Sequence, residues 1–240
     1  MGAHYYDQTL GSSGTVWHVS TEGSDEEGDG SISNPFETIQ HGINQASQSD
    51  TIQIHSGTFR PTSHLTIDKS ISFVGYGSPQ PTISLDSASI HANLWNDSQI
   101  ETNFTNLQFT SDGNTSEWAF ILNSGSFRFS DCHFYEIHNS YKLRVRNSFL
   151  DVTSCDFSNS DQIVDIVSWA DGDHNRINFN NNQINQESLW IELRDPTDSL
   201  FISDYEFLQK DVRLESGYLN LSDNIFNNCP IKFLVDEGFF

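Results

Sequence analysis

The chain is short of basic residues: its 240 residues include 11 lysines and arginines against 33 aspartates and glutamates, for a formal net charge of −22. Such a charge repels phosphate groups, so we expect no nucleic-acid partner and no attraction to an anionic membrane surface. Acidity of this degree suits solubility in a salty medium or the binding of multivalent cations, and a well-solvated surface is the simpler explanation.

Cysteine is also scarce, with Cys132, Cys155 and Cys229 as its three occurrences. An odd number of cysteines cannot be fully paired within one chain. Because no Cys-x-x-Cys motif or Cys/His cluster has zinc-site spacing, we expect no structural metal centre built on these thiols. Small buried side chains at a repeated position explain them without any chemistry.

Long apolar runs are absent, since no stretch of about 18 apolar residues occurs, and we expect no membrane insertion. Residues 1–10 are polar and aromatic and lack the pattern of a signal peptide. A chain rich in asparagine and serine contains glycosylation sequons by chance, so their presence favours secretion only weakly. The four sequons begin at Asn96, Asn103, Asn114 and Asn220.

Phenylalanine is abundant, with 18 residues, and most of the remaining chain is serine, asparagine, aspartate, threonine and glycine. Phenylalanine buries a large area per residue, and the small polar residues favour tight turns over long helices. The regular recurrence of apolar residues argues against disorder.

One amphipathic helix is predicted over residues 35–47. Asn34 suits the N-cap, Pro35 suits the first helical position, and Glu37 stands where a capping box places it. The apolar residues that follow fall on one helix face, which predicts about three turns. Short alternating strands flank this helix, so we expect it to cover the open end of a stack of strands.

Several motifs in residues 16–85 carry a resemblance to a known superfamily. Gly23-Ser24-Asp25, Asn34-Pro35-Phe36, Asp50-Thr51-Ile52, Ser56-Gly57-Thr58-Phe59 and the segment 67–75 together resemble the start of pectate-lyase-like parallel β-helix proteins. That superfamily includes pectate and alginate lyases, glycoside hydrolases, phage tailspikes and noncatalytic surface and adhesion proteins. The resemblance therefore implies a fold and leaves the activity open.

A six-residue pattern recurs after residue 100, with copies beginning at residues 104, 129, 152, 179, 202 and 221. A period in the low twenties is typical of a β-solenoid coil. The third position is Asn, Asp or Ser, which suits a bend with left-handed backbone. The fourth position is expected to stack coil on coil, through Leu107, Cys132, Cys155, Asn182, Tyr205 and Asn224.

These observations predict an all-β, right-handed parallel β-helix with an N-terminal capping helix. A single domain covers residues 16–240 and follows an N-terminal extension, residues 1–15. No second capping helix is evident near the C-terminus. Either Phe239 and Phe240 plug the last coil, or the chain is cut from a longer protein.

The first candidate site is a basic segment. Lys142, Arg144 and Arg146 alternate, so they are expected to share one strand face. A polysaccharide lyase needs positive charge or calcium beside the uronate carboxylate and a base to remove a proton. The alternative, a solvated strand face paired with nearby acids, is the one that we favour.

The second candidate site lies between residues 165 and 176. Asp165 and Asp173 are candidate catalytic carboxylates for hydrolysis, and Trp169 and Arg176 are candidate carbohydrate-binding residues. The alternative is a polar loop between coils, which we favour. The sequence sets that mark polygalacturonase-like hydrolases and one group of alginate lyases are absent, which argues against enzymes of those types.

Calcium is the one cofactor that the sequence suggests, although the fold requires none. Asp25 and Asp29 lie in an acidic loop that could offer oxygen ligands, and Asp171 and Asp173 form a similar pair. Neither segment has EF-hand spacing. The turn beside the cap explains the first loop equally well.

The leading functional hypothesis is a noncatalytic extracellular or cell-surface module with a structural or adhesive role, which contacts a polysaccharide or another surface protein. One alternative is an enzyme, a polysaccharide lyase or glycoside hydrolase that acts on an acidic polysaccharide. Another is a segment of a larger fibre that self-associates end to end.

Overall fold

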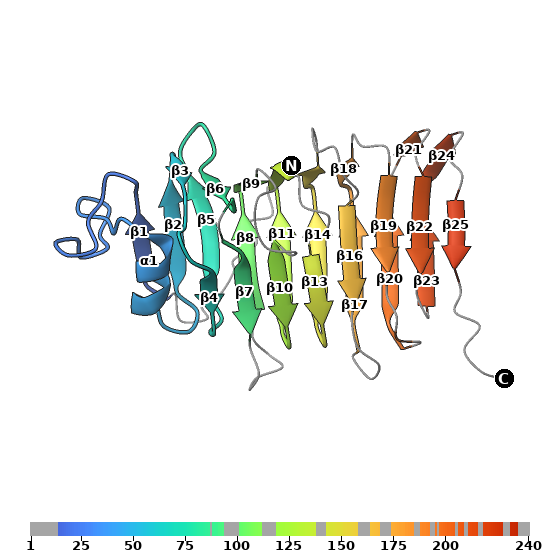
Figure 1. Cartoon of the computed structure of the whole chain (residues 1–240), viewed down its shortest axis with the longest axis horizontal. Helices are drawn as coiled ribbons and strands as arrows, with labels where there is room; N and C mark the ends of the chain where they lie inside the picture. Colours follow the sequence, from blue (N-terminus) through green and yellow to red (C-terminus); the bar gives the residue numbers. More distant parts are fainter. Residues whose placement is uncertain are drawn as a thin grey trace, which may run out of the picture.

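The structure, a computed structural model, describes residues 14–86, 88–93, 101–111, 119–137, 143–157, 164–168, 174–184, 188–192, 195, 197–204, 206–208, 211–215, 218–227 and 231–234. In this part of the chain, short parallel strands and one short helix form an elongated β-solenoid (Figure 1). The predicted all-β parallel solenoid with a helix near its N-terminus is confirmed.

Most coils place one strand in each of three sheets, and strands of successive coils pair in parallel. The nine-stranded sheet contains, in spatial order, β1 (Val16–Val19), β2 (Thr51–His55), β5 (Ser72–Tyr76), β8 (Glu101–Thr105), β11 (Ser126–Ser130), β14 (Phe149–Thr153), β17 (Arg176–Asn180), β20 (Ser199–Ser203) and β23 (Tyr218–Ser222). The eight-stranded sheet contains β4 (Leu65–Ile67), β7 (Ile90–Asn93), β10 (Phe120–Asn123), β13 (Leu143–Arg146), β16 (Val164–Ser168), β19 (Ser188–Glu192), β22 (Asp211–Glu215) and β25 (Ile231–Leu234). The six-stranded sheet contains β3 (Thr58–Phe59), β6 (Thr82–Ser84), β9 (Gln108–Ser111), β12 (His133–Ile137), β15 (Asp156–Phe157) and β18 (Gln183–Ile184), and a further pair is formed by β21 (Glu206–Leu208) and β24 (Ile225–Asn227).

A left-handed residue makes the bend that follows each of the last six strands of the nine-stranded sheet. The φ angles there lie between 51° and 57°, which asparagine and aspartate tolerate better than most residues. These are the third positions of the repeat, so the predicted bend is confirmed at every copy. The residues are Asn106, Asp131, Ser154, Asn181, Asp204 and Asp223.

The residue after each of the first four bends is buried, as expected for a position that stacks coil on coil. Leu107, Cys132 and Cys155 are buried. The Asn182 side chain accepts a hydrogen bond from the Cys155 backbone N–H at 2.8 Å and donates one to the Val152 carbonyl at 2.8 Å. Burial, together with the neighbouring Cys155 thiol, raises the pKa of the Cys132 thiol well above its ordinary value. Tyr205 and Cys229 lie outside the described residues.

Stacked phenylalanines fill much of the interior. The Phe104 ring lies between those of Phe73 and Phe129, with centroid distances of 5.0 and 4.7 Å. Phe134 and Phe157 stack at 4.5 Å in the same manner. Because strands of successive coils pair in register, equivalent side chains meet directly above one another. The repeat therefore builds one continuous apolar core.

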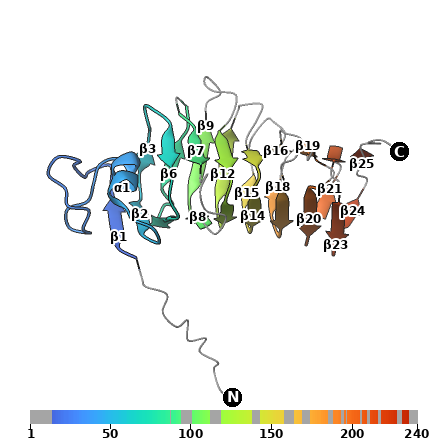
Figure 2. The same ribbon diagram turned by 90° about the horizontal axis from the view of Figure 1, so that it is seen from below.

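The capping helix is shorter than predicted. Helix α1 spans Ile39–Gln45, so the expected helix over residues 35–47 begins four residues too early and ends two residues too late. Its N-cap is Thr38, whose hydroxyl accepts a hydrogen bond from the His41 backbone N–H. Figures 1 and 2 show α1 at the N-terminal end of the stack, beside β1 and β2.

The early start is wrong because Phe36 joins the sheet edge instead of a helix. Its N–H donates to the His18 carbonyl at 3.0 Å, and its carbonyl accepts from the Ser20 N–H at 2.9 Å. The Asp25 carboxylate then accepts hydrogen bonds from the backbone N–H groups of Glu37 and Thr38 at 2.8 and 2.9 Å. These contacts give acceptors to the backbone N–H groups of Phe36, Glu37 and Thr38, which lie near the helix start predicted from Asn34.

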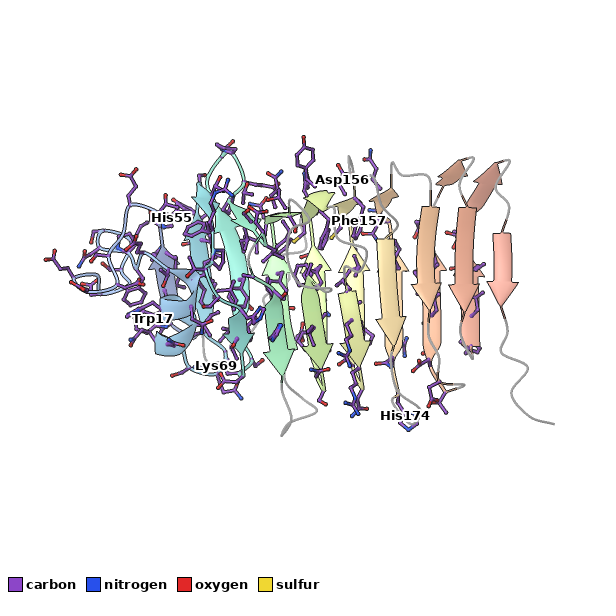
Figure 3. All side chains as sticks on the ribbon, in the orientation of Figure 1. Trp17, His55, Lys69, Asp156, Phe157 and His174 are labelled. Atoms are coloured by element: carbon purple, nitrogen blue, oxygen red, sulfur yellow. The ribbon has the colours of Figure 1, made fainter. Side chains whose placement is uncertain are left out.

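Asp50 joins the cap to the first coil. Its buried carboxylate accepts hydrogen bonds from the Thr15 N–H at 2.7 Å, the Trp17 indole N–H at 2.9 Å and the Ser47 N–H at 2.7 Å. Figure 3 shows Trp17 at this end of the stack. Burial alone would raise the pKa of Asp50, but these hydrogen bonds and the Lys69 charge hold it below its ordinary value.

We expect the change Asp50→Ala to lower the free energy of unfolding by about 3 kcal/mol, because three donors to a charged acceptor lose their partner. Chemical denaturation measures this loss. Asp68→Ala is the matched control, since the Asp68 side chain is 71% exposed and its nearest ion-pair distance is 3.9 Å, to Lys69. Equal stability of the two variants would contradict the role assigned to Asp50.

The bend residues allow a second test. Asp131→Val should lower the free energy of unfolding by about 1–2 kcal/mol, because a β-branched residue is strained at positive φ. Asp131→Gly should cost less, since glycine adopts this conformation freely. Thermal unfolding of the two variants compares them directly, and a valine variant as stable as the glycine variant would refute the argument.

Candidate functional site

An arginine lies among aromatic rings on the outer face of the nine-stranded sheet. The guanidinium carbon of Arg176 lies 4.6 Å from the centre of the Phe201 ring and 5.9 Å from that of Phe149. The ring of Tyr218 lies 5.6 Å from that of Phe201. We call these four residues the aromatic platform, because cation–π contacts hold the charge against ring surfaces.

Strand register assembles the platform from four coils. Phe149 of β14 pairs with Arg176 of β17, Arg176 pairs with Ser199 of β20, and Ser199 pairs with Tyr218 of β23. Phe201 stands two residues after Ser199 and so points to the same face. Tyr218 remains 53% exposed, while Phe149 and Phe201 are half-buried. The platform thus presents apolar ring surface to solvent.

Arg176 differs from a second arginine on the same face, Arg128, in having no ion-pair partner among the described residues. Arg128 forms ion pairs with Glu101 at 2.8 Å and with Asp151 at 3.2 Å. Within the described part of the chain, Arg176 forms no ion pair. Its guanidinium donors therefore stay available to a ligand, which is notable in so acidic a protein.

Arg176 is one of the carbohydrate-binding residues predicted from the sequence, but its aromatic neighbours are not among them. Alternation would have placed Phe149 and Phe201 on the outer face, since Leu150, Leu200 and Ile202 point inward. Nothing local, however, indicates that residues of four different coils meet. Trp169, the other predicted carbohydrate-binding residue, lies outside the described residues.

The predicted basic face is present in part, on another sheet. Arg144 and Arg146 of β13 are half-buried and share the outer face of the eight-stranded sheet, as expected. Arg144 pairs in register with Ile121 of β10 and Val167 of β16. Lys142 lies outside the described residues. The structure therefore separates this pair from the aromatic platform by placing the two on different sheets.

Only part of the candidate hydrolase cluster falls within the described residues, so this site stays a prediction. Asp165 lies on β16 of the eight-stranded sheet, whereas Arg176 lies on β17 of the nine-stranded sheet. Asp171 and Asp173 lie outside the described residues. His174, which Figure 3 labels, is exposed, and its Nδ1 lies 2.6 Å from the Thr197 hydroxyl.

Structural hydrogen bonds involve both predicted calcium ligands of the acidic loop. Burial acts to raise the pKa of Asp25, but hydrogen bonds from Thr38 and Glu37 hold it below its ordinary value. Asp29 accepts a hydrogen bond from the Ser31 N–H at 2.9 Å. Among the residues that the structure describes, no group of three or more His, Cys, Asp or Glu residues is placed to hold a metal ion. Calcium binding stays a prediction.

Two histidines meet at the N-terminal end of the same outer face. His18 Nδ1 of β1 lies 3.0 Å from His55 Nε2 of β2, and their rings are nearly perpendicular at 77°. The Tyr76 ring lies 5.1 Å from that of His55. Burial lowers the pKa of both histidines, and the charge of His55 lowers that of His18 further. Protons on all four ring nitrogens would remove the hydrogen bond.

This pair predicts acid-sensitive stability. Unfolding lets both imidazoles take up protons at their ordinary pKa of 6.5, which the folded pair resists. The free energy of unfolding should therefore be highest above that pH and fall as the pH drops below it. Thermal melts between about pH 8 and pH 5 test the expectation. The variant His18→Gln/His55→Gln should show a shallower fall, and an unchanged fall would refute it.

Comparisons with known proteins add a likeness in fold. No protein-family model and no curated protein matches the chain. Among solved structures it is similar to a rhamnogalacturonan lyase, with 12% sequence identity and a TM-score of 0.42. The match covers 93% of this chain and 64% of that one, so the chain spans less than two thirds of the lyase's length. Identity and score are too low to carry an argument about activity.

No helix in the described segments is long and apolar enough to cross a membrane.

Proposed function

We propose that this chain is a noncatalytic, extracellular β-helix module that contacts carbohydrate through the aromatic platform. The observation that carries the proposal is that Arg176 lies against the half-buried rings of Phe149 and Phe201 without an ion-pair partner among the described residues. Aromatic rings offer flat apolar surface to the C–H face of a sugar, and tyrosine adds a polar group at its edge.

The ligand class is an acidic polysaccharide, whose carboxylates meet Arg176 at close range, since salt screens the repulsion from the net charge of −22 beyond about 10 Å. The guanidinium of Arg176 has a planar set of donors that matches a carboxylate in a bidentate manner. The adjacent rings exclude water from one side of such a pair, which strengthens it. A neutral polysaccharide would use the rings alone and leave this charge without a partner.

The surroundings of the platform favour binding over catalysis. Hydrolysis needs two carboxylates about 5–10 Å apart across the scissile bond. Two carboxylates on the same face, Glu101 and Asp151, are engaged by Arg128. These two carboxylates already have a cationic partner on the sheet surface, so they are not placed as a pair on either side of a bound glycosidic bond.

We expect Phe201→Ala and Tyr218→Ala each to weaken binding to polygalacturonate at least about tenfold, because each removes stacking surface. Arg176→Gln should weaken binding to polygalacturonate but leave binding to its methyl ester nearly unchanged, because only the former carries the carboxylate. Affinity electrophoresis measures both ligands. Arg128→Gln is the matched control on the same face, and an equal loss there would contradict the site.

An enzyme is the second candidate, since Arg144 and Arg146 do share a strand face. Incubation with polygalacturonate and with alginate separates the two functions. The proposed module releases no unsaturated product. Release of such a product, lost in Arg144→Ala or Arg146→Ala, would replace the noncatalytic assignment with a lyase.

A further inference from the structure

A cavity lies at the opposite end of the stack from the aromatic platform's last strand. Its volume is about 390 Å³, within the range of small-molecule sites. Three segments form its walls: the start of α1, the loop that follows β3, and Thr21. It shares no residue with the aromatic platform.

The walls of the cavity are held in place by hydrogen bonds outside it. Asp25 binds the N–H groups of Glu37 and Thr38, and Gln40 Oε1 accepts from the Thr66 N–H at 2.9 Å. On the opposite wall, Arg60 is fixed by the Ser84 hydroxyl at 3.1 Å and by Asp86 at 2.8 Å. A cavity built in this way needs little rearrangement to accept a ligand, which favours affinity.

Several polar side chains that line the cavity are exposed to solvent and have no hydrogen-bond partner among the described residues. Among the described residues, nothing hydrogen-bonds to the hydroxyls of Thr21, Thr58, Thr62 and Ser63 or to the Glu37 carboxylate. Each hydroxyl can both donate and accept. Beneath them, Phe59 and neighbouring apolar side chains form a buried floor. The cavity therefore combines an apolar base with solvent-exposed hydroxyls that can bind a ligand in place of water.

We propose that this cavity binds a neutral sugar unit, the end or a branch of a saccharide. Sugar hydroxyls donate and accept in the same way as the cavity's own hydroxyls, and a pyranose ring fits the volume. An anionic ligand fits poorly, because Asp86 already neutralises Arg60 and the remaining charge, Glu37, is negative. The site is distinct from the proposed acidic-polysaccharide surface and does not depend on it.

Isothermal titration with cellobiose, maltose and lactose tests the site on the full chain. We expect at least one of these disaccharides to bind saturably. Thr58→Val should weaken that binding about three- to tenfold through loss of one hydroxyl, and Glu37→Gln should weaken it to a similar extent because an acceptor oxygen is replaced by an NH2 donor. Thr66→Val is the matched control, since Thr66 is exposed nearby but does not line the cavity.

A second variant distinguishes loss of binding from loss of folding. Ser63→Trp adds bulk at an exposed position, so it should block the cavity and abolish binding while the thermal midpoint stays at the wild-type value. Tyr218→Ala should leave disaccharide binding intact, which separates this site from the aromatic platform. The proposal is overturned if no neutral disaccharide binds, if glucosamine binds and the neutral sugars do not, or if Thr58→Val and Ser63→Trp bind as wild type.

Discussion

In-register parallel pairing between successive coils is the constraint on which the rest of this structure depends. Each strand of the nine-stranded sheet satisfies its backbone groups only through the coils before and after it. That pairing holds only if every coil turns its corners at the same place. The left-handed residue after each of the last six strands of this sheet, as at Asp131 and Asn181, makes that shared corner. A coil that failed to bend there would lose its hydrogen bonds on both sides.

Register has opposite consequences on the two faces of the sheet. Inside, it places phenylalanines directly above one another, so that Phe104 stacks on both of its neighbours in a continuous core. Outside, the same spacing of about 4.8 Å between strands brings charged and aromatic residues of different coils together. Arg128 meets two carboxylates in this way, and Arg176 meets aromatic rings. One geometric rule therefore builds both the stable interior and the candidate binding surface.

The N-terminal end of the stack is stabilised differently, because β1 is the first strand of the nine-stranded sheet and no earlier coil pairs with it. Polar side chains take over the role of the missing strands: Asp50 binds three donors, and Asp25 binds the start of the helix. This arrangement fixes loops that a solenoid coil would otherwise leave unsupported. It also leaves the cavity between helix α1 and the loop after β3, where exposed side-chain hydroxyls have no hydrogen-bond partner among the described residues. The cavity is thus formed by side-chain hydrogen bonds at the N-terminal end, whereas the aromatic platform is formed by register between coils.

Features that depend on a few adjacent residues were open to prediction from the sequence. Alternation of apolar and polar residues, the period of the coils and the left-handed bends are local, because each follows from strand geometry or from a single residue's backbone preference. The residue at which the helix starts, by contrast, is set by contacts between residues that are distant in the sequence. It depends on Phe36 pairing with β1 and on Asp25, 13 residues before Thr38, and both contacts override the capping signal at Asn34.

The sequence by itself therefore determined the solenoid, its bends and its buried stacks. Only the tertiary structure decided which outward-facing residues meet, because residues 17 to 37 positions apart become neighbours through register between coils. His18 and His55 are one such pair, and Arg176 with the rings around it is another. No local pattern contains that information, since a shift of one residue in register would turn the same side chains to the other face.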